Sequence, residues 1–302
     1  MSYLKISFGT TGWGLFGYAS AVLGHLYHAN DDKHVPFIDI QNIDYGDKEN
    51  NNDAWSPFWK PVCHLSKEEI EEICSNSNDK IVLSHDGRPN LGVFGNFRDW
   101  KPSVYRELRP VVDKYFRIHD HIQKDVDEFV NNYIAGKKTL ALHYRGTDKH
   151  VEARRIPESE VLEAIEKIVQ KRGYEQVYVC TDEIEVMEYF QKMIPQKCRI
   201  PVLKSKSIRT TGAHPLYKVN RDNYSNNKEI CKQVFINELT NYRKGYDVIF
   251  DVYTMARCTG LVRCISNVSD WVVLVSDTIE ESWFLHRLHD PLTPHPGLYV
   301  GR

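Results

Sequence analysis

Arg145 is the residue of this chain whose type and position most clearly indicate a chemical role. It follows an apolar run, Thr139–Tyr144, that predicts a β-strand, and Gly146 comes directly after it. A guanidinium group at a strand end can bind two oxygens of a diphosphate at once, and it stays charged at every working pH. His143, near the end of the same run, is a second candidate. A histidine buried in the core and an arginine in a surface salt bridge would give the same sequence. An anion site and a structural role therefore both remain open.

Polar residues also follow two other predicted strands. The run Val177–Cys180 is followed by Thr181 and Asp182, and the run Leu261–Ile265 is followed by Ser266, Asn267, Val268 and Ser269. Where a helix begins after a strand, hydroxyl groups and backbone N–H groups make a site for an anion. The same residues also serve as ordinary helix caps, because a side-chain oxygen accepts from the N–H groups of the first turn. Both interpretations remain open for both segments.

A glycine-rich segment near the N-terminus is a further candidate. Gly9, Gly12 and Gly14 stand between a predicted strand at Lys5–Phe8 and a predicted helix at Leu15–His28. Glycines let the backbone turn sharply or pass close to a ligand. The spacing is not that of a dinucleotide-binding turn, and no acidic residue follows in the ribose position. A tight turn, a phosphate loop and an acceptor-facing loop are therefore all open.

The elements that must position these residues alternate regularly after Ala135–Lys138. Strands are predicted at Thr139–Tyr144, Val177–Cys180, Arg199–Leu203 and Leu261–Ile265, and helices at Ser159–Arg172, Glu183–Lys192, Lys228–Tyr242, Asp247–Arg257 and Val268–Ser276. Such alternation is typical of βαβ units and a parallel sheet. Ligands of open parallel sheets bind at the carboxyl ends of the strands. We therefore expect the candidate residues to lie at one sheet edge.

The N-terminal part is less regular. Strands are predicted at Lys5–Phe8, Val35–Ile40 and Ile81–Leu83, and helices at Leu15–His28, from Ser66 onward and at Ile122–Tyr133, whereas Asp99–Tyr115 shows no clear period. We expect an N-terminal α/β lobe over residues 1–136, a second lobe over 137–285 and an irregular tail over 286–302. The α/β class is the expected fold.

Composition excludes several other classes of protein. The 302 residues carry 39 Lys and Arg against 41 Asp and Glu, a formal charge of −2. Nucleic-acid binding surfaces carry a basic excess, so nucleic acid is not an expected partner. No apolar run approaches the ~18 residues that a membrane span needs, and the N-terminus lacks a signal-peptide pattern. Seven cysteines without a CxxC pair are typical of small buried hydrophobic residues in a reducing compartment. We therefore expect no membrane span and a cytoplasmic protein.

Together the segments resemble one family, the GDP-fucose-dependent fucosyltransferases, which include core α1,6 enzymes, nodulation enzymes and protein O-fucosyltransferases. HYRGTDKHVEA resembles their HxRRTDK…EA stretch, VYVCTDEIEVMEYF is similar to their ATDD strand, and YDVIFDVYTMARCTGLVRCISNVS is similar to their D-x-x-x-L-s-x-A-D…SS segment. GTTGWGLFGYASAVL resembles their glycine-rich N-terminal segment. The motifs cover 139–276 well and the first lobe loosely. The resemblance implies a GT-B-like fold, with two Rossmann-type lobes that face a central cleft.

The resemblance also implies a reaction. An inverting, metal-independent enzyme would transfer a sugar, fucose from GDP-fucose first, onto a glycan hydroxyl. Its partners would be a nucleotide-sugar donor and an oligosaccharide or glycoconjugate acceptor, with no separate cofactor. Arg145 would bind the diphosphate, Asp251 the base or ribose, and further donor contacts would come from His143, Gly146, Thr181, Asp182, Ser266, Asn267, Val268 and Ser269. Asp148, Lys149 and Glu152 follow the same strand, and Glu152 is the first choice for the catalytic base, before Asp148 and Asp182.

Two departures from the family pattern keep alternatives open. Gly146 replaces the second family arginine, and Asn267 replaces the usual second serine. The chain could use another nucleotide sugar, such as UDP-xylose or a rhamnose donor, or it could be an inactive nucleotide- or carbohydrate-binding module. The DxD letters at Asp125–Asp127 are expected on a solvated helix face, so no metal is expected. Because a glycan on the Asn267 sequon would block the phosphate pocket, we expect no maturation in a secretory lumen. Four tryptophans are open to either sugar stacking or core packing: Trp13, Trp55, Trp59 and Trp100.

Overall fold

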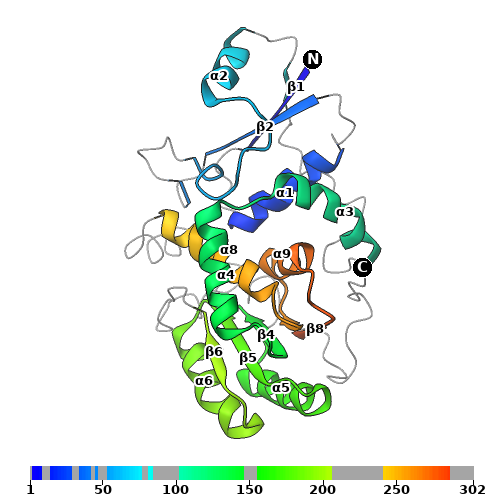
Figure 1. Cartoon of the computed structure of the whole chain (residues 1–302), viewed down its shortest axis with the longest axis vertical. Helices are drawn as coiled ribbons and strands as arrows, with labels where there is room; N and C mark the ends of the chain where they lie inside the picture. Colours follow the sequence, from blue (N-terminus) through cyan, green and yellow to red (C-terminus); the bar gives the residue numbers. More distant parts are fainter. Residues whose placement is uncertain are drawn as a thin grey trace, which may run out of the picture. The chain divides into compact units, whose positions relative to one another are not determined.

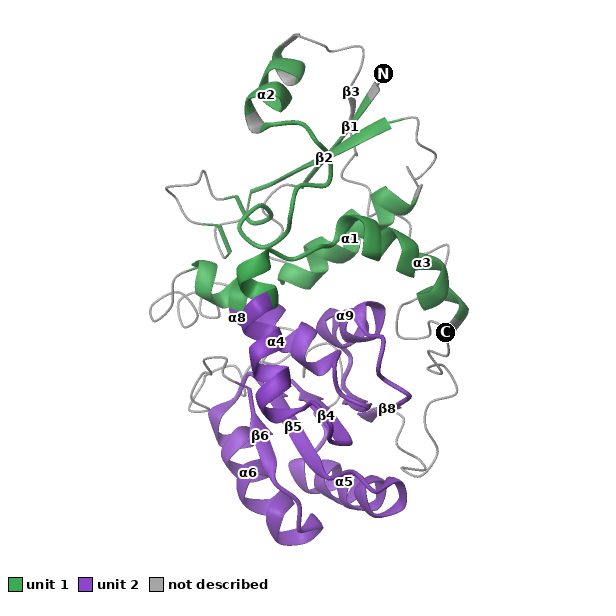
Figure 2. Ribbon diagram, viewed as in Figure 1, with its two compact units in different colours: residues 1–123, 240–246 green, residues 124–239, 247–302 purple. Residues whose placement is uncertain are grey.

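The computed structural model describes most of the chain in two compact units. The described residues are 2–8, 14–28, 34–41, 45–46, 53–76, 81–83, 102–145, 155–205 and 241–285. The first unit comprises 1–123 with 240–246, and the second comprises 124–239 with 247–302 (Figure 2). Each unit contains its own parallel sheet.

The first unit contains a three-stranded sheet in the order β2-β1-β3. Its elements are β1 (Ser2–Phe8), α1 (Leu15–His28), β2 (His34–Ile40), α2 (Lys67–Asn76), β3 (Ile81–Leu83) and α3 (Pro102–Tyr115). Both pairings are parallel, and β1 pairs with β2 along its whole length. Helix α2 starts as its sequence predicts: Glu69 N–H donates to Ser66 Oγ, and Ser66 N–H donates to the Glu69 carboxylate.

Helix α3 was not predicted from the sequence. Its buried residues Tyr105, Leu108, Val112 and Tyr115 recur at helical spacing. Pro110 lies inside the helix, and a proline within a helical pattern normally indicates a helix end. The apolar stripe was therefore present, but the proline and the charged residues between its members obscured it.

Two of the tryptophans that the sequence left open belong to the core of the first unit. Trp55 and Trp59 are 4% and 1% exposed, and their rings stack with centroids 4.3 Å apart. Phe16 and Phe116 contact the pair edge-on. Sugar stacking is therefore wrong for these two residues. Trp13 and Trp100 lie outside the described residues.

The second unit contains a five-stranded parallel sheet in the order β6-β5-β4-β7-β8 (Figure 1). Its strands are β4 (Thr139–Tyr144), β5 (Gln176–Thr181), β6 (Val202–Lys204), β7 (Gly260–Arg263) and β8 (Glu281–Phe284). Its helices are α4 (Asp120–Tyr133), α5 (Glu158–Arg172), α6 (Ile184–Cys198), α8 (Asn241–Met255) and α9 (Asn267–Val275). The first turn of α4 and the start of α8 belong to the first unit. The predicted βα alternation is confirmed for the described residues, and β8 is an addition to it. The predicted helix at Lys228–Tyr242 lies outside them except for its last two residues, which begin α8.

Helices cover both faces of this sheet. Leu140, Leu142 and Tyr144 of β4 belong to one core cluster with residues of α5 and α6. On the opposite face, Tyr178 of β5 contacts Phe129 of α4. Phe129 also packs against α8, and this explains why most of α4 belongs to the second unit although the sequence suggested a boundary after it. The α/β class is confirmed.

The strand order reverses beside β4. From β4 the chain continues to β5 and β6 on one side, and β7 and β8 lie on the other side. The carboxyl ends of β4 and β7 therefore form a topological switch point, the position at which open α/β sheets bind ligands. Within the ranges that the structure describes, no helix is long and apolar enough to cross a membrane. The predicted tail, 286–302, lies outside those ranges.

Gly260, the first residue of β7, gives a test of the packing at the amino end of the sheet. A Cβ atom at this position would lie 2.0 Å from the hydroxyl of Tyr174, a buried residue. Gly260→Ala should lower the free energy of unfolding by about 1–3 kcal/mol, because the core must rearrange to accept a methyl group. Denaturant unfolding measures the loss. In the double variant with Tyr174→Phe, which removes the nearest atom, the two losses should be less than additive; full additivity would contradict the contact.

Candidate functional site

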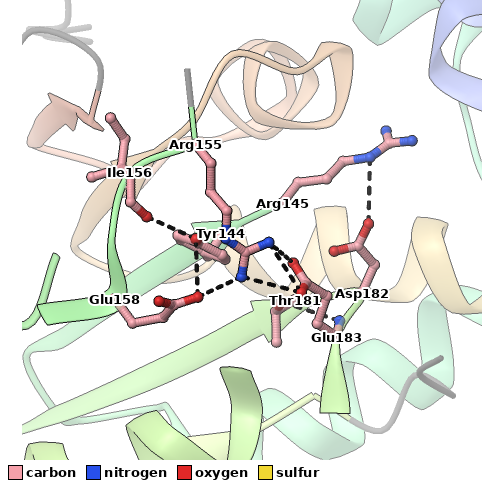
Figure 3. Close-up of polar contacts among 8 residues, drawn as sticks. All are labelled: Tyr144, Arg145, Arg155, Ile156, Glu158, Thr181, Asp182 and Glu183. Atoms are coloured by element: carbon pink, nitrogen blue, oxygen red, sulfur yellow. Dashed lines mark hydrogen bonds and ion pairs between the residues drawn. The ribbon is translucent and has the colours of Figure 1, made fainter. Parts of the chain in front are cut away.

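Arg145 lies at the carboxyl edge of the five-stranded sheet, as its sequence predicts. Tyr144 pairs with Thr181 at the ends of β4 and β5, so Arg145 and Asp182 are the next residues beyond the paired strands. Arg145 Nε lies 3.6 Å from Asp182 Oδ2, and the two side chains are 30% and 26% exposed. Figure 3 shows both Nη atoms of Arg145 pointing away from Asp182. One side of the guanidinium thus faces a carboxylate, and the two Nη atoms lie on the side away from it.

His143 joins β4 to the start of α9. Its Nδ1 lies 2.6 Å from Ser269 Oγ and 3.7 Å from Cys264 Sγ, and all three side chains are buried. Burial raises the pKa of Cys264 to about 11, although Arg145 lowers it in part. The structure therefore brings together His143 and Arg145 at the end of β4, Cys264 after β7 and Ser269 in the first turn of α9.

The segment before α9 caps the helix as predicted. Ser266 occupies the N-cap position with an extended backbone, and its Oγ accepts from Val268 N–H at 3.3 Å. Asn267 is the first residue of α9 and is partly exposed. The capping interpretation of Ser266 is confirmed, and phosphate binding at this helix start stays a prediction.

A buried ion pair fixes the first turn of α9. Arg263, the last residue of β7, places Nη1 2.7 Å from Asp270 Oδ1, and the side chains are 4% and 10% exposed. The Arg263 guanidinium also lies over the ring of Phe284. Arg263 lies within the predicted strand Leu261–Ile265 and Asp270 within the predicted helix Val268–Ser276, but no role was predicted for either residue. Through this ion pair, the start of α9 is attached directly to the end of β7.

Thr181 and Asp251 make contacts within the fold. Thr181 Oγ1 accepts from Glu183 N–H at 3.3 Å, but Glu183 is the N-cap residue of α6, so Thr181 lies before the cap and does not accept from the first turn of the helix. Asp251 of α8 is buried and accepts hydrogen bonds from Tyr178 Oη at 3.1 Å and from Ser205 Oγ. Asp251 therefore lies against β5 and the residue after β6, whereas Arg145 follows β4. Its predicted contact with a nucleotide base or ribose stays a prediction.

Several predicted site residues lie outside the described part of the chain: Gly9, Gly12, Gly146, Asp148, Lys149 and Glu152. Gly14 is described, and its carbonyl accepts from Gly17 N–H at 2.7 Å in a tight turn that opens α1. Among the described residues, no group of three His, Cys, Asp or Glu side chains could hold a metal ion. In the DxD sequence Asp125–Asp127, Asp125 is exposed and Asp127 pairs with Arg257.

The comparisons with known proteins concern the fold. No family model matches the chain, and no curated protein matches its sequence. Among solved structures, the fucosyltransferase NodZ from Bradyrhizobium is similar with a TM-score of 0.57 and 13% identity, over 93% of this chain and 95% of that one. NodZ α-1,6-fucosyltransferase soaked with GDP-fucose is similar with a TM-score of 0.55 and 14% identity, over 93% and 94% of the two chains. This likeness confirms the GT-B-like α/β fold that the motifs implied.

The buried pair under α9 gives a test of how the site is held. Asp270→Asn leaves the Arg263 charge buried without its counter-ion, so the free energy of unfolding should fall by about 3–5 kcal/mol. Denaturant unfolding measures this loss. The double variant Arg263→Met/Asp270→Leu removes both charges and should be more stable than Asp270→Asn alone. If the single variant keeps wild-type stability, the ion pair does not anchor α9.

Proposed function

We propose that this protein is an inverting, metal-independent glycosyltransferase that moves fucose from GDP-fucose onto a glycan hydroxyl. The observation that carries the proposal is the position of Arg145 and the α9 start at the topological switch point of the second sheet. The likeness to NodZ, whose crystals were soaked with GDP-fucose, supports this choice of donor. The motif resemblance over 139–276 supports it independently of the fold.

The chemistry requires that negative charge on the departing diphosphate be stabilised. Preorganised donors aimed at developing charge are usually the largest single contribution to such catalysis. The guanidinium of Arg145 can bind two oxygens at once, and the N–H groups at the start of α9 can bind a further oxygen. Arg145 and these N–H groups are protein donors that would stabilise the negative charge of the departing diphosphate.

The acceptor hydroxyl must also lose its proton to a positioned base. We assign this role to Glu152, with Asp148 and then Asp182 as the next candidates, and Lys149 beside the acceptor. The support for Glu152 is its place in the family motif. A cytoplasmic location belongs to the same proposal, because Asn267 is the first residue of α9 and an N-linked glycan there would cover the proposed phosphate position.

Nucleotide selectivity tests the donor. GDP at one hundred times its dissociation constant should stabilise the native protein by about 2.7 kcal/mol, since a ligand that binds only the folded state raises its melting temperature. Differential scanning with GDP, UDP, ADP and CDP measures this shift, and GDP should give the largest. A preference for UDP would replace the fucose assignment with another nucleotide sugar. No shift with any nucleotide would overturn the transferase proposal.

Removal of the Arg145 side chain tests the catalytic assignment. Arg145→Ala should reduce sugar transfer by about 10²–10³-fold, a loss of roughly 3–4 kcal/mol of transition-state stabilisation. The measurement is release of GDP from GDP-fucose in the presence of a glycan acceptor panel. Arg172→Ala is the matched control, because Arg172 is equally exposed but pairs with Glu281 at the start of β8, the opposite edge of the sheet. Equal turnover in the two variants would refute the role of Arg145.

A further inference from the structure

Glu183 has an unusual environment for a carboxylate at a helix start. It is the N-cap residue of α6, yet its side chain makes no capping hydrogen bond and is 1% exposed. Both of its carboxylate oxygens accept instead from the guanidinium of Arg155: Nη1 lies 3.0 Å from Oε1 and 3.2 Å from Oε2, and Nη2 lies 3.2 Å from Oε2. A planar arginine fork that engages both oxygens fixes the direction of a carboxylate as well as its charge.

Arg155 connects three elements of the second unit. It lies just before α5 and donates a further hydrogen bond to Glu158 in the first turn of that helix. Its guanidinium lies over the ring of Tyr144, the last residue of β4, at 5.6 Å from the ring centre. The Tyr144 hydroxyl in turn donates to the Ile156 carbonyl at 2.8 Å. The ends of β4 and β5 and the starts of α5 and α6 therefore meet at one side chain.

This cluster lies directly beneath the candidate site. The Asp182–Glu183 peptide bond joins the pair Arg145–Asp182 to the buried pair Arg155–Glu183 (Figure 3). The Tyr144–Arg145 peptide bond joins Arg145 to the tyrosine whose ring Arg155 covers. Because neighbouring side chains at a strand end point in opposite directions, a fixed Glu183 side chain restricts where the Asp182 carboxylate can lie.

We propose that Arg155 and Glu183 are positioning residues, whose ion pair holds Asp182 against Arg145 Nε and thereby directs the Arg145 fork at the donor diphosphate. This inference rests on the proposed function. Neither residue touches the donor. Their effect is on affinity for the nucleoside diphosphate through the geometry of Arg145.

The positioning should depend on pH in a known direction. Burial raises the pKa of Glu183 to about 7, with smaller contributions from Asp182 and Glu158, while the Arg155 guanidinium opposes the shift. Among the described residues, the charged and titratable groups around Glu183 are Arg155, Glu158, Tyr144, Asp182 and Arg145. A raised pKa means that the carboxylate is charged above about pH 7 and protonated below it. The ion pair, and the positioning with it, is therefore present at alkaline pH and is lost as the pH falls.

Calorimetric titration with GDP at about pH 8.5 and about pH 5.5 tests the proposal. Glu183→Gln removes the charge with little change of shape, and it should raise the dissociation constant about tenfold at the higher pH. At the lower pH the ratio to wild type should approach one, because wild-type Glu183 is itself protonated there. The ionisation of GDP is common to both proteins and cancels in this ratio.

Arg155→Lys separates geometry from charge. Lysine keeps every formal charge but cannot engage both carboxylate oxygens, so at the higher pH it should also weaken GDP binding several-fold. The matched controls are Glu281→Gln and Arg172→Lys, which change the ion pair at the opposite sheet edge and should bind GDP as wild type does. Circular dichroism confirms that each variant is folded at the titration temperature.

The outcomes discriminate the proposal from its alternatives. If Glu183 acted only by repelling the diphosphate through space, Glu183→Gln would bind GDP more tightly at the higher pH, and Arg155→Lys would bind it unchanged. A ratio that is the same at both pH values would indicate a structural effect of the amide. Each of these results overturns the positioning role. The proposed function is unaffected by them as long as the wild-type protein binds GDP. If wild type itself does not bind GDP, the proposed function fails.

Discussion

The parallel pairing of β4 with both of its neighbours is the constraint on which the candidate site depends. His143 is paired with Cys180 on one side and with Arg263 on the other. Side chains alternate between the two faces of a strand, so a slip of one residue would exchange the faces of His143 and Tyr144. In this register His143 meets α9, and Tyr144 meets the segment before α5. One strand therefore organises both the candidate site and the cluster beneath it.

Two ion pairs with buried members lie at the ends of these strands. Arg263–Asp270 joins β7 to α9, and the Arg155 pair joins the ends of β4 and β5 to the starts of α5 and α6. The removal of two charges from water costs about as much as their attraction returns, so such pairs add little net stability. What they supply is direction, because an arginine fork and a carboxylate tolerate few relative orientations. The polar contacts beneath the candidate site thus fix the orientation of side chains more than they add to the free energy of unfolding.

The sequence predicted the parts of the fold that follow from local patterns. Continuous apolar runs identified β4 and β5, and residues at the strand ends correctly indicated where Arg145 and Ser269 would meet the sheet edge. Partners that are distant in sequence could not be predicted, and Arg155 and Glu183 are 28 residues apart. Helix α3 was missed because Pro110 interrupts its pattern. Strand β8 was missed because its sequence, Glu-Ser-Trp-Phe, is half polar and contains no continuous apolar run.

The thiol of Cys264 lies among the groups of the candidate site, and its high pKa has a consequence for the chemistry of the whole protein. At neutral pH the sulfur is almost entirely protonated, and a protonated, buried thiol reacts slowly with peroxides and alkylating reagents. Oxidants therefore react with this sulfur mainly in molecules that have lost their native packing. The site can contain a cysteine without acquiring sensitivity to the redox state of its surroundings.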